Sequence, residues 1–244
     1  MLCEDASSSG VKWNLDIVRR TLEIDYYTDM LCVWAYLAQI KVDELQKEFG
    51  ERLLIHHKYL NLFGNTRHKI AAMENGFAGY SQHVREVVAH FPHVSVHERI
   101  WLDAAPCSSL PVHLVLKAVQ ILHQEGQLAP LQVNNRSIPV ELSWRLREAF
   151  FQRGENISDW QCLASYLEAL DISLEQVQAL LGSGRAAAAL CLDMQEQNER
   201  GIEGSPTFLL NEGRQKLYGN VGYRVIAANV QELLEREVDL PDWC

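Results

Sequence analysis

The sequence predicts an α/β fold in which two small groups of strands flank a long block of helices. Three observations support this prediction: a strand–helix–strand pattern in the first third of the chain, a helical middle, and a strand–strand–helix pattern near the C-terminus. A βαβ unit implies that its two strands pair in parallel. The expected order of elements is therefore βαβ, a helical block, then ββα.

The first third carries the βαβ pattern. Residues 21–27 mix β-branched and aromatic side chains in near alternation, which is typical of a strand. Apolar side chains recur at helical spacing through residues 32–49, and Gly50 lies where a helix commonly ends. Residues 52–60 then predict a second strand.

The middle of the chain predicts helices. Pro111 and Pro139 fall near helix starts, where the missing N–H of proline costs nothing. Ser158 and Ser173 are candidate N-caps, and the second of them opens a capping box. Residues 94–102 predict either an edge strand or an extended segment. The predicted helices span residues 79–91, 111–123, 139–153, 158–170, 173–181 and 184–200.

The strand pattern returns near the C-terminus. Residues 207–210 and 215–218 predict two short strands, and Asn211-Glu212-Gly213 between them indicates a hairpin turn. Residues 223–237 predict a closing helix.

Length and charge restrict the class of protein. The 244 residues can bury a core without disulfides or metals, in one large domain or in a small domain with an insertion. The net charge of −10 argues against nucleic acid or an anionic membrane as the main partner, because both bind basic surfaces. Residues 1–10 lack the features of a secretory signal, and no apolar stretch is long enough to cross a bilayer. The six cysteines are widely scattered, so we expect most to be reduced and the protein to be cytoplasmic.

Three motifs together resemble one family. Residues 27–36, Tyr-Thr-Asp-Met-Leu-Cys-Val-Trp-Ala-Tyr, resemble the active-site segment of cytoplasmic DsbA-like oxidoreductases, in which Cys-Pro-Trp-Cys opens the first helix. Residues 204–208, Gly-Ser-Pro-Thr-Phe, are similar to the cis-proline loop that precedes the third core strand of the thioredoxin superfamily. Residues 105–109, with the following helix that bears His113, are similar to the start of a helix in the inserted domain. The similarity covers roughly residues 22–237.

This resemblance implies a thioredoxin fold (βαβ…ββα) with an all-helical domain inserted between its second and third core strands. The thioredoxin-like domain would comprise residues 21–70 and 201–238, the helical insertion residues 71–200, and an N-terminal extension residues 1–20.

Cys32 is the candidate nucleophile. A cysteine at the first turn of a helix faces the positive end of the helix dipole and several free backbone N–H groups, and both favour the thiolate. We therefore expect a lowered pKa for Cys32. The alternative is that Cys32 is a small buried apolar residue, as most cysteines are. The Pro206 loop in the same chain favours the nucleophile.

The active-site segment departs from the family pattern at two positions. Val33 replaces the proline of the motif and Ala35 replaces its second cysteine. A dithiol site releases its mixed disulfide when the second thiolate attacks the first sulfur, which Ala35 cannot do. Cys32 must then be resolved by an external thiol such as glutathione, by another cysteine of this chain, or by the substrate itself. The sequence thus predicts a monothiol thiol-disulfide oxidoreductase that forms mixed disulfides with glutathione or a thiol substrate, without a permanently bound cofactor.

The resemblance also implies binding residues. A cis Ser205–Pro206 bond would leave the Ser205 backbone free to pair with an extended peptide or to hold glutathione beside the sulfur. Trp34 either lines the substrate groove or packs on the inserted domain, and Ala35 would shape the pocket. Asn61 lies where related enzymes form part of the rim, or in a plain loop.

Two other functions remain open at this point. The first is a glutathione-dependent transferase or isomerase, as in kappa-class glutathione transferases and hydroxychromene-carboxylate isomerases, which share the architecture and usually carry a serine where this chain has Cys32. The second is a redox-inactive binding module that keeps the thioredoxin groove. Expected partners are a small thiol or a peptide or protein disulfide, with a homodimer possible.

Several histidines could suggest a metal site. Adjacent histidines on a strand point to opposite faces, and the other four span a helix end and an extended segment without Cys or carboxylate at ligand spacing. We therefore expect no metal. The histidines concerned are His56, His57, His83, His90, His93 and His97.

Overall fold

The computed structural model describes residues 21–129, 133, 134 and 136–235. The predicted N-terminal extension, residues 1–20, and the last two residues of the predicted closing helix lie outside this part of the chain, as do Cys3 and Cys244.

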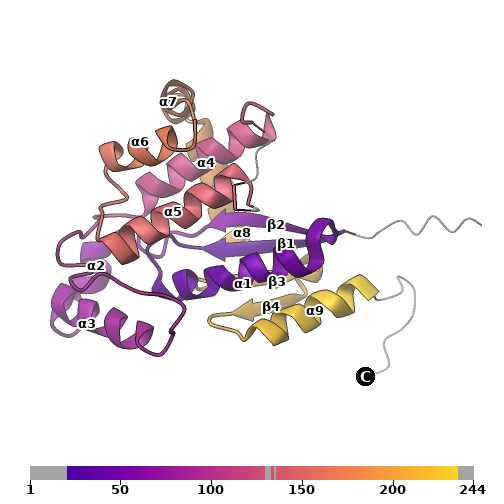
Figure 1. Cartoon of the computed structure of the whole chain (residues 1–244), viewed down its shortest axis with the longest axis horizontal. Helices are drawn as coiled ribbons and strands as arrows, with labels where there is room; N and C mark the ends of the chain where they lie inside the picture. Colours follow the sequence, from indigo (N-terminus) through magenta and orange to yellow (C-terminus); the bar gives the residue numbers. More distant parts are fainter. Residues whose placement is uncertain (1–20, 130–132, 135, 236–244) are drawn as a thin grey trace, which may run out of the picture.

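Within these described residues, four strands form one mixed sheet in the order β2-β1-β3-β4 (Figure 1). β1 pairs in parallel with β2 and antiparallel with β3, and β3 pairs antiparallel with β4. This arrangement confirms the predicted parallel βαβ unit and the C-terminal hairpin. The strands are β1 (Leu22–Thr28), β2 (Leu53–Tyr59), β3 (Thr207–Leu210) and β4 (Gln215–Tyr218).

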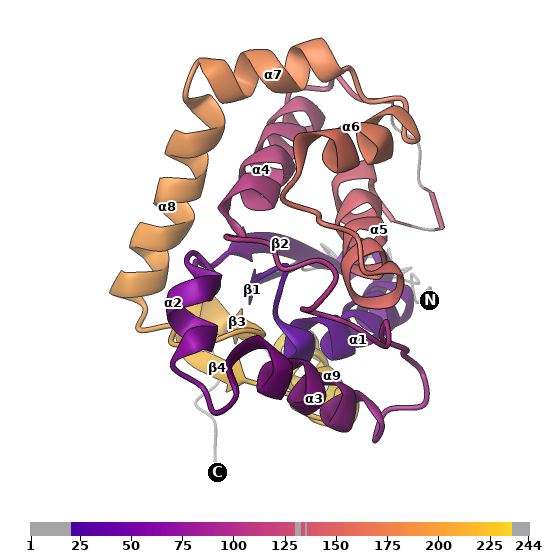
Figure 2. The ribbon, with the colours of Figure 1, turned by 90° about the vertical axis from the view of Figure 1, so that its left-hand side faces the viewer.

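Helices fill the chain between the strands. Those from α2 to α8 all lie between β2 and β3 in the sequence, which confirms a helical insertion at this point of an α/β fold. Figures 1 and 2 show α2 and α3 at the end of the sheet where α1 begins. The helices are α1 (Val33–Phe49), α2 (Thr66–Ala71), α3 (Gly76–Val88), α4 (Leu110–Gln124), α5 (Ile138–Arg153), α6 (Trp160–Glu168), α7 (Leu174–Gly182), α8 (Arg185–Glu199) and α9 (Tyr223–Glu235).

The two faces of the sheet are covered by different helices. On one face α1 and α9 pack together, and Val42 and Ile226 share a buried cluster with Tyr26 of β1. Tyr27, the next residue of β1, points to the opposite face, where its hydroxyl donates to Glu196 of α8 over 3.5 Å. The strand that carries the site is therefore covered on both faces.

The structure differs from the predicted elements at two segments. α2 was not predicted, because a helix of only six residues is too short to show an apolar period. Its start is fixed by Asn65, whose side-chain oxygen accepts a hydrogen bond from the backbone N–H of His68 at 2.9 Å. For residues 94–102 one of the two predicted alternatives, the edge strand, is wrong: residues 94–97 have no regular secondary structure, turns follow, and β2 and β4 are the edges of the sheet.

One of the two predicted helix caps is wrong. α6 is capped by Asp159 and not by Ser158, because the Asp159 carboxylate accepts the backbone N–H groups of Gln161 and Cys162. Ser173 caps α7 as predicted.

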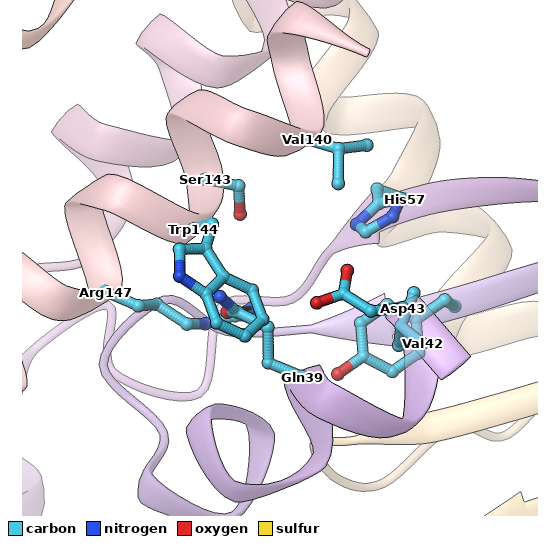
Figure 3. Close-up of a pocket in the computed structure, with 9 residues that line it drawn as sticks. Gln39, Val42, Asp43, His57, Val140, Ser143, Trp144 and Arg147 are labelled. Atoms are coloured by element: carbon cyan, nitrogen blue, oxygen red, sulfur yellow. Dashed lines mark hydrogen bonds between the residues drawn. The ribbon is translucent and has the colours of Figure 1, made fainter. Parts of the chain in front are cut away.

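A buried arginine joins α5 to α1 and β1. Arg147 is 1% exposed and donates to Gln39 Oε1 at 2.6 Å and to Thr28 Oγ1 at 2.5 Å. Beside it lies a small cavity whose volume open to the centre of a water molecule is about 10 Å³, enough for one water (Figure 3). Cys32 does not border this cavity. Its lining residues are Tyr26, Gln39, Val42, Asp43, His57, Val140, Ser143, Trp144 and Arg147.

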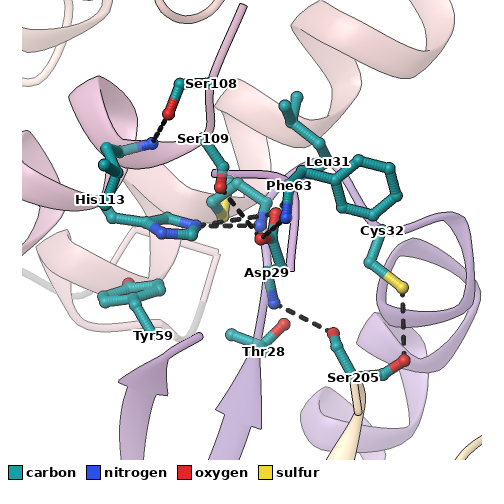
Figure 4. A network of polar contacts seen from close by, with 12 residues as sticks. Thr28, Asp29, Leu31, Cys32, Tyr59, Phe63, Ser108, Ser109, His113 and Ser205 are labelled. Atoms are coloured by element: carbon teal, nitrogen blue, oxygen red, sulfur yellow. Dashed lines mark hydrogen bonds and ion pairs between the residues drawn. The ribbon is translucent and has the colours of Figure 1, made fainter. Parts of the chain in front are cut away.

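Asp29, directly after β1, connects four segments of the chain (Figure 4). Its carboxylate is fully buried and accepts hydrogen bonds from Leu31 N, Phe63 N and Ser109 Oγ, each at 2.9 Å. Its own backbone N–H donates to Ser205 Oγ at 2.9 Å. The start of α1, the loop after β2, the start of α4 and the loop before β3 are thereby fixed to one residue.

His113 of α4 supports the same turn. Its Nε2 accepts the backbone N–H of Met30 at 3.1 Å, and its ring stacks on Tyr59 with 5.1 Å between centroids. Burial lowers the pKa of His113 to about 4, although the nearby Asp29 carboxylate acts in the opposite direction. The imidazole is therefore neutral at pH 7, and because Nε2 accepts, its proton is on Nδ1.

The buried neutral His113 predicts a loss of stability in acid. The pKa of His113 is lower in the folded than in the unfolded chain. The contribution of the neutral imidazole to the free energy of unfolding is therefore fully present above about pH 6.5 and is lost as the pH falls toward 4. The unfolding free energy of the native chain should decrease between pH 7 and pH 4.5. In His113→Gln, whose side chain can still accept from Met30, we expect this decrease to be smaller by about 2 kcal/mol. Urea denaturation at several pH values measures this.

The matched control is His123→Gln, which replaces an exposed histidine of the same helix and should follow the native pH dependence. Identical pH dependences for the native chain and His113→Gln would contradict the assignment of a neutral, buried imidazole.

Candidate active site

Cys32 lies at the N-terminus of α1, as predicted. Its backbone is extended (φ −84°, ψ 118°) and it caps the helix, which begins at Val33. Its N–H donates to Asp29 O at 3.1 Å, and its carbonyl accepts the first helical bond, from Tyr36 N, at 3.1 Å. The turn held by Asp29 therefore fixes where the thiol enters the helix.

The thiol lies against the loop that precedes β3. Cys32 Sγ donates to the carbonyl oxygen of Ser205 at 3.2 Å (Figure 4), and the Ser205–Pro206 peptide bond is cis. Two motifs separated by 173 residues in the sequence thus meet at one sulfur atom. The structure brings together Cys32, Ser205 and Pro206 from the predicted set of site residues.

The expectation of a lowered pKa for Cys32 is wrong for this arrangement. Cys32 is only 6% exposed, and this burial raises the pKa of its thiol, with a smaller contribution in the same direction from the Asp29 carboxylate. The backbone N–H groups of Ala35 and Trp34 and the side chain of Ser205 lower the pKa, but by less than burial raises it. The helix N-terminus acts as expected, and desolvation of the thiolate outweighs it.

No second thiol accompanies Cys32 in the segment. Ala35 is fully buried. In the part of the chain that the structure describes, all cysteines are free, and Cys107 is exposed. The site therefore offers one thiol with a buried methyl group at the position of the missing cysteine.

Trp34 and Asn61 lie at different places. Trp34 is half-buried, packs against the core of the helical insertion and makes an edge-to-face contact with Phe91, with 6.3 Å between ring centroids. Of its two predicted roles, the structure thus contains the packing contact. Asn61 is exposed in the loop after β2, and its side chain lies over Gly64, where an added Cβ would fall 1.7 Å from the Asn61 Oδ1 atom.

Asp29 and His113 belong to the motifs found in the sequence, but no role was predicted for either. Their position was the available signal: Asp29 directly follows a strand buried on both faces, and a buried carboxylate needs several donors. His113 lies three residues before Leu116 and six before Val119, both buried, so it falls on the buried side of α4.

Among residues 21–129, 133, 134 and 136–235, no cluster of three or more His, Cys, Asp or Glu side chains could hold a metal ion. Within the same ranges, no helix combines the length and the apolar character needed to cross a bilayer.

Known proteins share this architecture. The chain is 24% identical to a protein of Halalkalibacterium halodurans described as the ClpXP adapter protein SpxH, over 227 residues that cover 88% of this chain and 69% of that protein. The structure of the cytosolic disulfide reductase DsbM from Pseudomonas aeruginosa with GSH is similar, with a TM-score of 0.64 and 18% identity over 88% of this chain and 100% of that chain. A 2-hydroxychromene-2-carboxylate isomerase gives a TM-score of 0.59 and 14% identity over 86% and 95% of the two chains.

A family model matches most of the chain. Residues 23–231 match the DSBA-like thioredoxin domain, and the match includes both groups of strands, the helical insertion, Cys32 and Pro206. The chain therefore belongs to the DSBA-like thioredoxin domain family.

Proposed function

We propose that this protein is a cytoplasmic thiol-disulfide oxidoreductase that works through the single thiol of Cys32. The observation that carries the proposal is the contact between Cys32 Sγ and the carbonyl of Ser205, 3.2 Å away in the loop of the cis peptide bond to Pro206. A sulfur at this position can react while an extended substrate pairs with the Ser205 backbone. With Ala35 in place of the second cysteine, the covalent intermediate must leave through another thiol.

The proposed reaction has two exchange steps. The Cys32 thiolate attacks one sulfur of a substrate disulfide, the substrate S–S bond breaks, and the departing thiolate takes up a proton. A mixed disulfide between Cys32 and the substrate remains. A glutathione thiolate then attacks the substrate sulfur of this bond, which releases Cys32 as a thiolate and the substrate as its glutathione mixed disulfide. Each step makes one S–S bond and breaks one.

Ser205 links binding to activation. Its carbonyl accepts from the Cys32 thiol, and a thiolate has no proton to donate. When Cys32 loses its proton, the carbonyl becomes free to accept a backbone N–H of the substrate. Substrate binding through this carbonyl and formation of the nucleophile therefore favour one another.

The similar proteins support the proposed oxidoreductase and also leave one alternative enzyme. The similar reductase is described as cytosolic and was solved with GSH, which agrees with the proposed compartment and co-substrate. A transferase or isomerase that uses glutathione is the alternative, since the hydroxychromene-carboxylate isomerase has the same fold.

A redox-inactive binding module is the second candidate. The burial of Cys32, at 6% exposure, favours it, and so does the description of the Halalkalibacterium halodurans relative as an adapter protein. A binding module needs the groove beside Pro206 but no reactive sulfur.

Glutathionylation separates the oxidoreductase from the binding module. After incubation with oxidised glutathione, we expect one glutathionyl group on the peptide that carries Cys32, detected by mass spectrometry, and its removal by reduced glutathione. Cys32→Ser should lose this adduct, and Cys107→Ser, the control at an exposed cysteine, should keep it. An adduct at Cys107 without one at Cys32 would overturn the oxidoreductase and leave the binding module.

Burial predicts the pH dependence of Cys32 alkylation. Because burial keeps Cys32 protonated, we expect iodoacetamide to label it more slowly than Cys107 at pH 7. The labelling rate of Cys32 should still increase above about pH 8.5, the ordinary midpoint of a free thiol. Peptide mass spectrometry at several pH values gives both rates in one sample. A Cys32 rate that levels off below that midpoint would show that the helix N-terminus outweighs burial.

Restoring the second cysteine should create a dithiol enzyme. Residues 32 and 35 are one helical turn apart, a separation that a disulfide can bridge. We expect Ala35→Cys to form the 32–35 disulfide in oxidising buffer and to accelerate the reduction of insulin by dithiothreitol. The added sulfur enters a fully buried position, so overpacking of about 1–3 kcal/mol accompanies the gain.

The control is Ala38→Cys, which places a thiol at an equally buried position one turn further along α1, out of reach of Cys32. Reductase activity in both variants, or no 32–35 disulfide in Ala35→Cys, would show that residue 35 does not face the thiol.

A further inference from the structure

Tyr218, the last residue of β4, is the most exposed of the large hydrophobic side chains in the described part of the chain, at 63%. Single exposed apolar residues are common on protein surfaces. The position of Tyr218 is what separates it from the others, because it lies next to the loop that contacts the reactive sulfur.

Tyr218 packs directly on the backbone of that loop. A Cβ added to Gly204 would fall 2.3 Å from Cε2 of Tyr218 and 2.6 Å from its hydroxyl oxygen, so the ring occupies the space that a side chain at position 204 would need. Thr207 is the partner of Tyr218 in the antiparallel ladder, and the next residue, Gly219, donates its N–H to Pro206 O at 2.8 Å. The ring is thereby fixed to the loop through both strands of the hairpin.

The ring covers the residue next to the one that contacts the thiol. Gly204, which it covers, directly precedes Ser205, and the carbonyl of Ser205 is 3.2 Å from Cys32 Sγ. Consecutive Cα atoms are about 3.8 Å apart, and an extended substrate advances about 3.3 Å per residue. A peptide paired with the Ser205 backbone therefore brings a residue next to its cysteine, or the one beyond, to the Tyr218 ring.

The chemistry of this surface selects a class of substrate. The ring offers an apolar face, and the nearest charged side chain of β4, Lys216, is held away by hydrogen bonds to the carbonyls of Arg200 and Gly201, each at 2.8 Å. An aliphatic or aromatic side chain can bury itself on such a ring. Glutathione has no apolar side chain beside its cysteine and gains little from it.

We propose that Tyr218 is a specificity-determining residue, a binding surface for an apolar side chain next to the reacting cysteine of a peptide or protein disulfide. The inference rests on the proposed function of Cys32 and adds to it that peptidic disulfides with apolar neighbours are preferred to small thiols. Tyr218 binds the substrate and takes no part in the exchange of sulfur bonds.

Two probe peptides test this. Gly-Leu-Cys-Leu-Gly and Gly-Gly-Cys-Gly-Gly are each prepared as the mixed disulfide with thionitrobenzoate, which leaves as a thiolate when Cys32 attacks the peptide sulfur. The rate of adduct formation at Cys32 is followed by mass spectrometry of the peptide that carries it, so the other cysteines do not interfere. We expect the full-length protein to react faster with the leucine peptide.

Tyr218→Ala should slow the leucine peptide about tenfold and change the rate for the glycine peptide by less than about twofold. Tyr218→Phe should retain the native rates, because the apolar face and not the hydroxyl is required. Leu192→Ala, which removes another exposed apolar side chain, at 59%, is the matched control and should also retain them. Equal rates for both peptides in the native protein and in Tyr218→Ala would overturn the role of Tyr218 while leaving that of Cys32. No adduct at Cys32 with either peptide would overturn both.

Discussion

The site depends on the buried residue Asp29. Its carboxylate accepts three hydrogen bonds and its N–H makes a fourth, so that the turn before α1, the loop after β2, the start of α4 and the loop before β3 have one common centre. A buried carboxylate is tolerable only when its oxygens are satisfied, and the donors are in turn satisfied only by it. The position of the thiol relative to the loop of Pro206 follows from this mutual requirement.

Two opposing effects act on the thiol itself. The start of α1 supplies N–H groups that favour a thiolate, and the surrounding core removes the water that would stabilise its charge. In this arrangement burial dominates. The thiol is consequently a hydrogen-bond donor to Ser205, and its reactivity depends on what replaces that bond. In the proposed function, a backbone N–H of the substrate replaces the thiol as the donor to the Ser205 carbonyl.

The order of strands and helices could be predicted from the sequence because each element is indicated by a pattern within a few consecutive residues. The structure contains the elements that these patterns predicted: alternation for strands, helical spacing for helices, the turn at Asn211-Glu212-Gly213 and the cis-proline motif. α2 was not predicted because its sequence contains only one indication of a helix, the cap residue Asn65, and the helix is shorter than two turns. Asp159 displaced Ser158 as a cap because both types cap helices well, and only the three-dimensional geometry distinguishes neighbours.

The raised pKa of Cys32 and the position of Tyr218 beside the loop of Pro206 could not be predicted from the sequence for another reason. Both depend on contacts between segments that are distant in the chain. Cys32 belongs to a core cluster with Tyr80, Trp101 and Phe150 of the insertion, and no local pattern indicates how deeply that cluster buries the thiol. Nothing in the sequence distinguishes Tyr218 from other residues of an edge strand. Its contact with Gly204 follows from the pairing of β3 with β4.

The sequence distances across the Asp29 centre also determine when this site can exist during folding. Its contacts close loops of 34, 80 and 176 residues, so the last of them forms only after almost the whole chain has been synthesised. Such non-local closures are slow and carry the largest entropic cost. Until the loop before β3 docks, Cys32 lacks the hydrogen-bond acceptor of its thiol. A chain that ends before residue 205 therefore contains the insertion residues that bury the thiol but lacks the carbonyl to which the thiol donates.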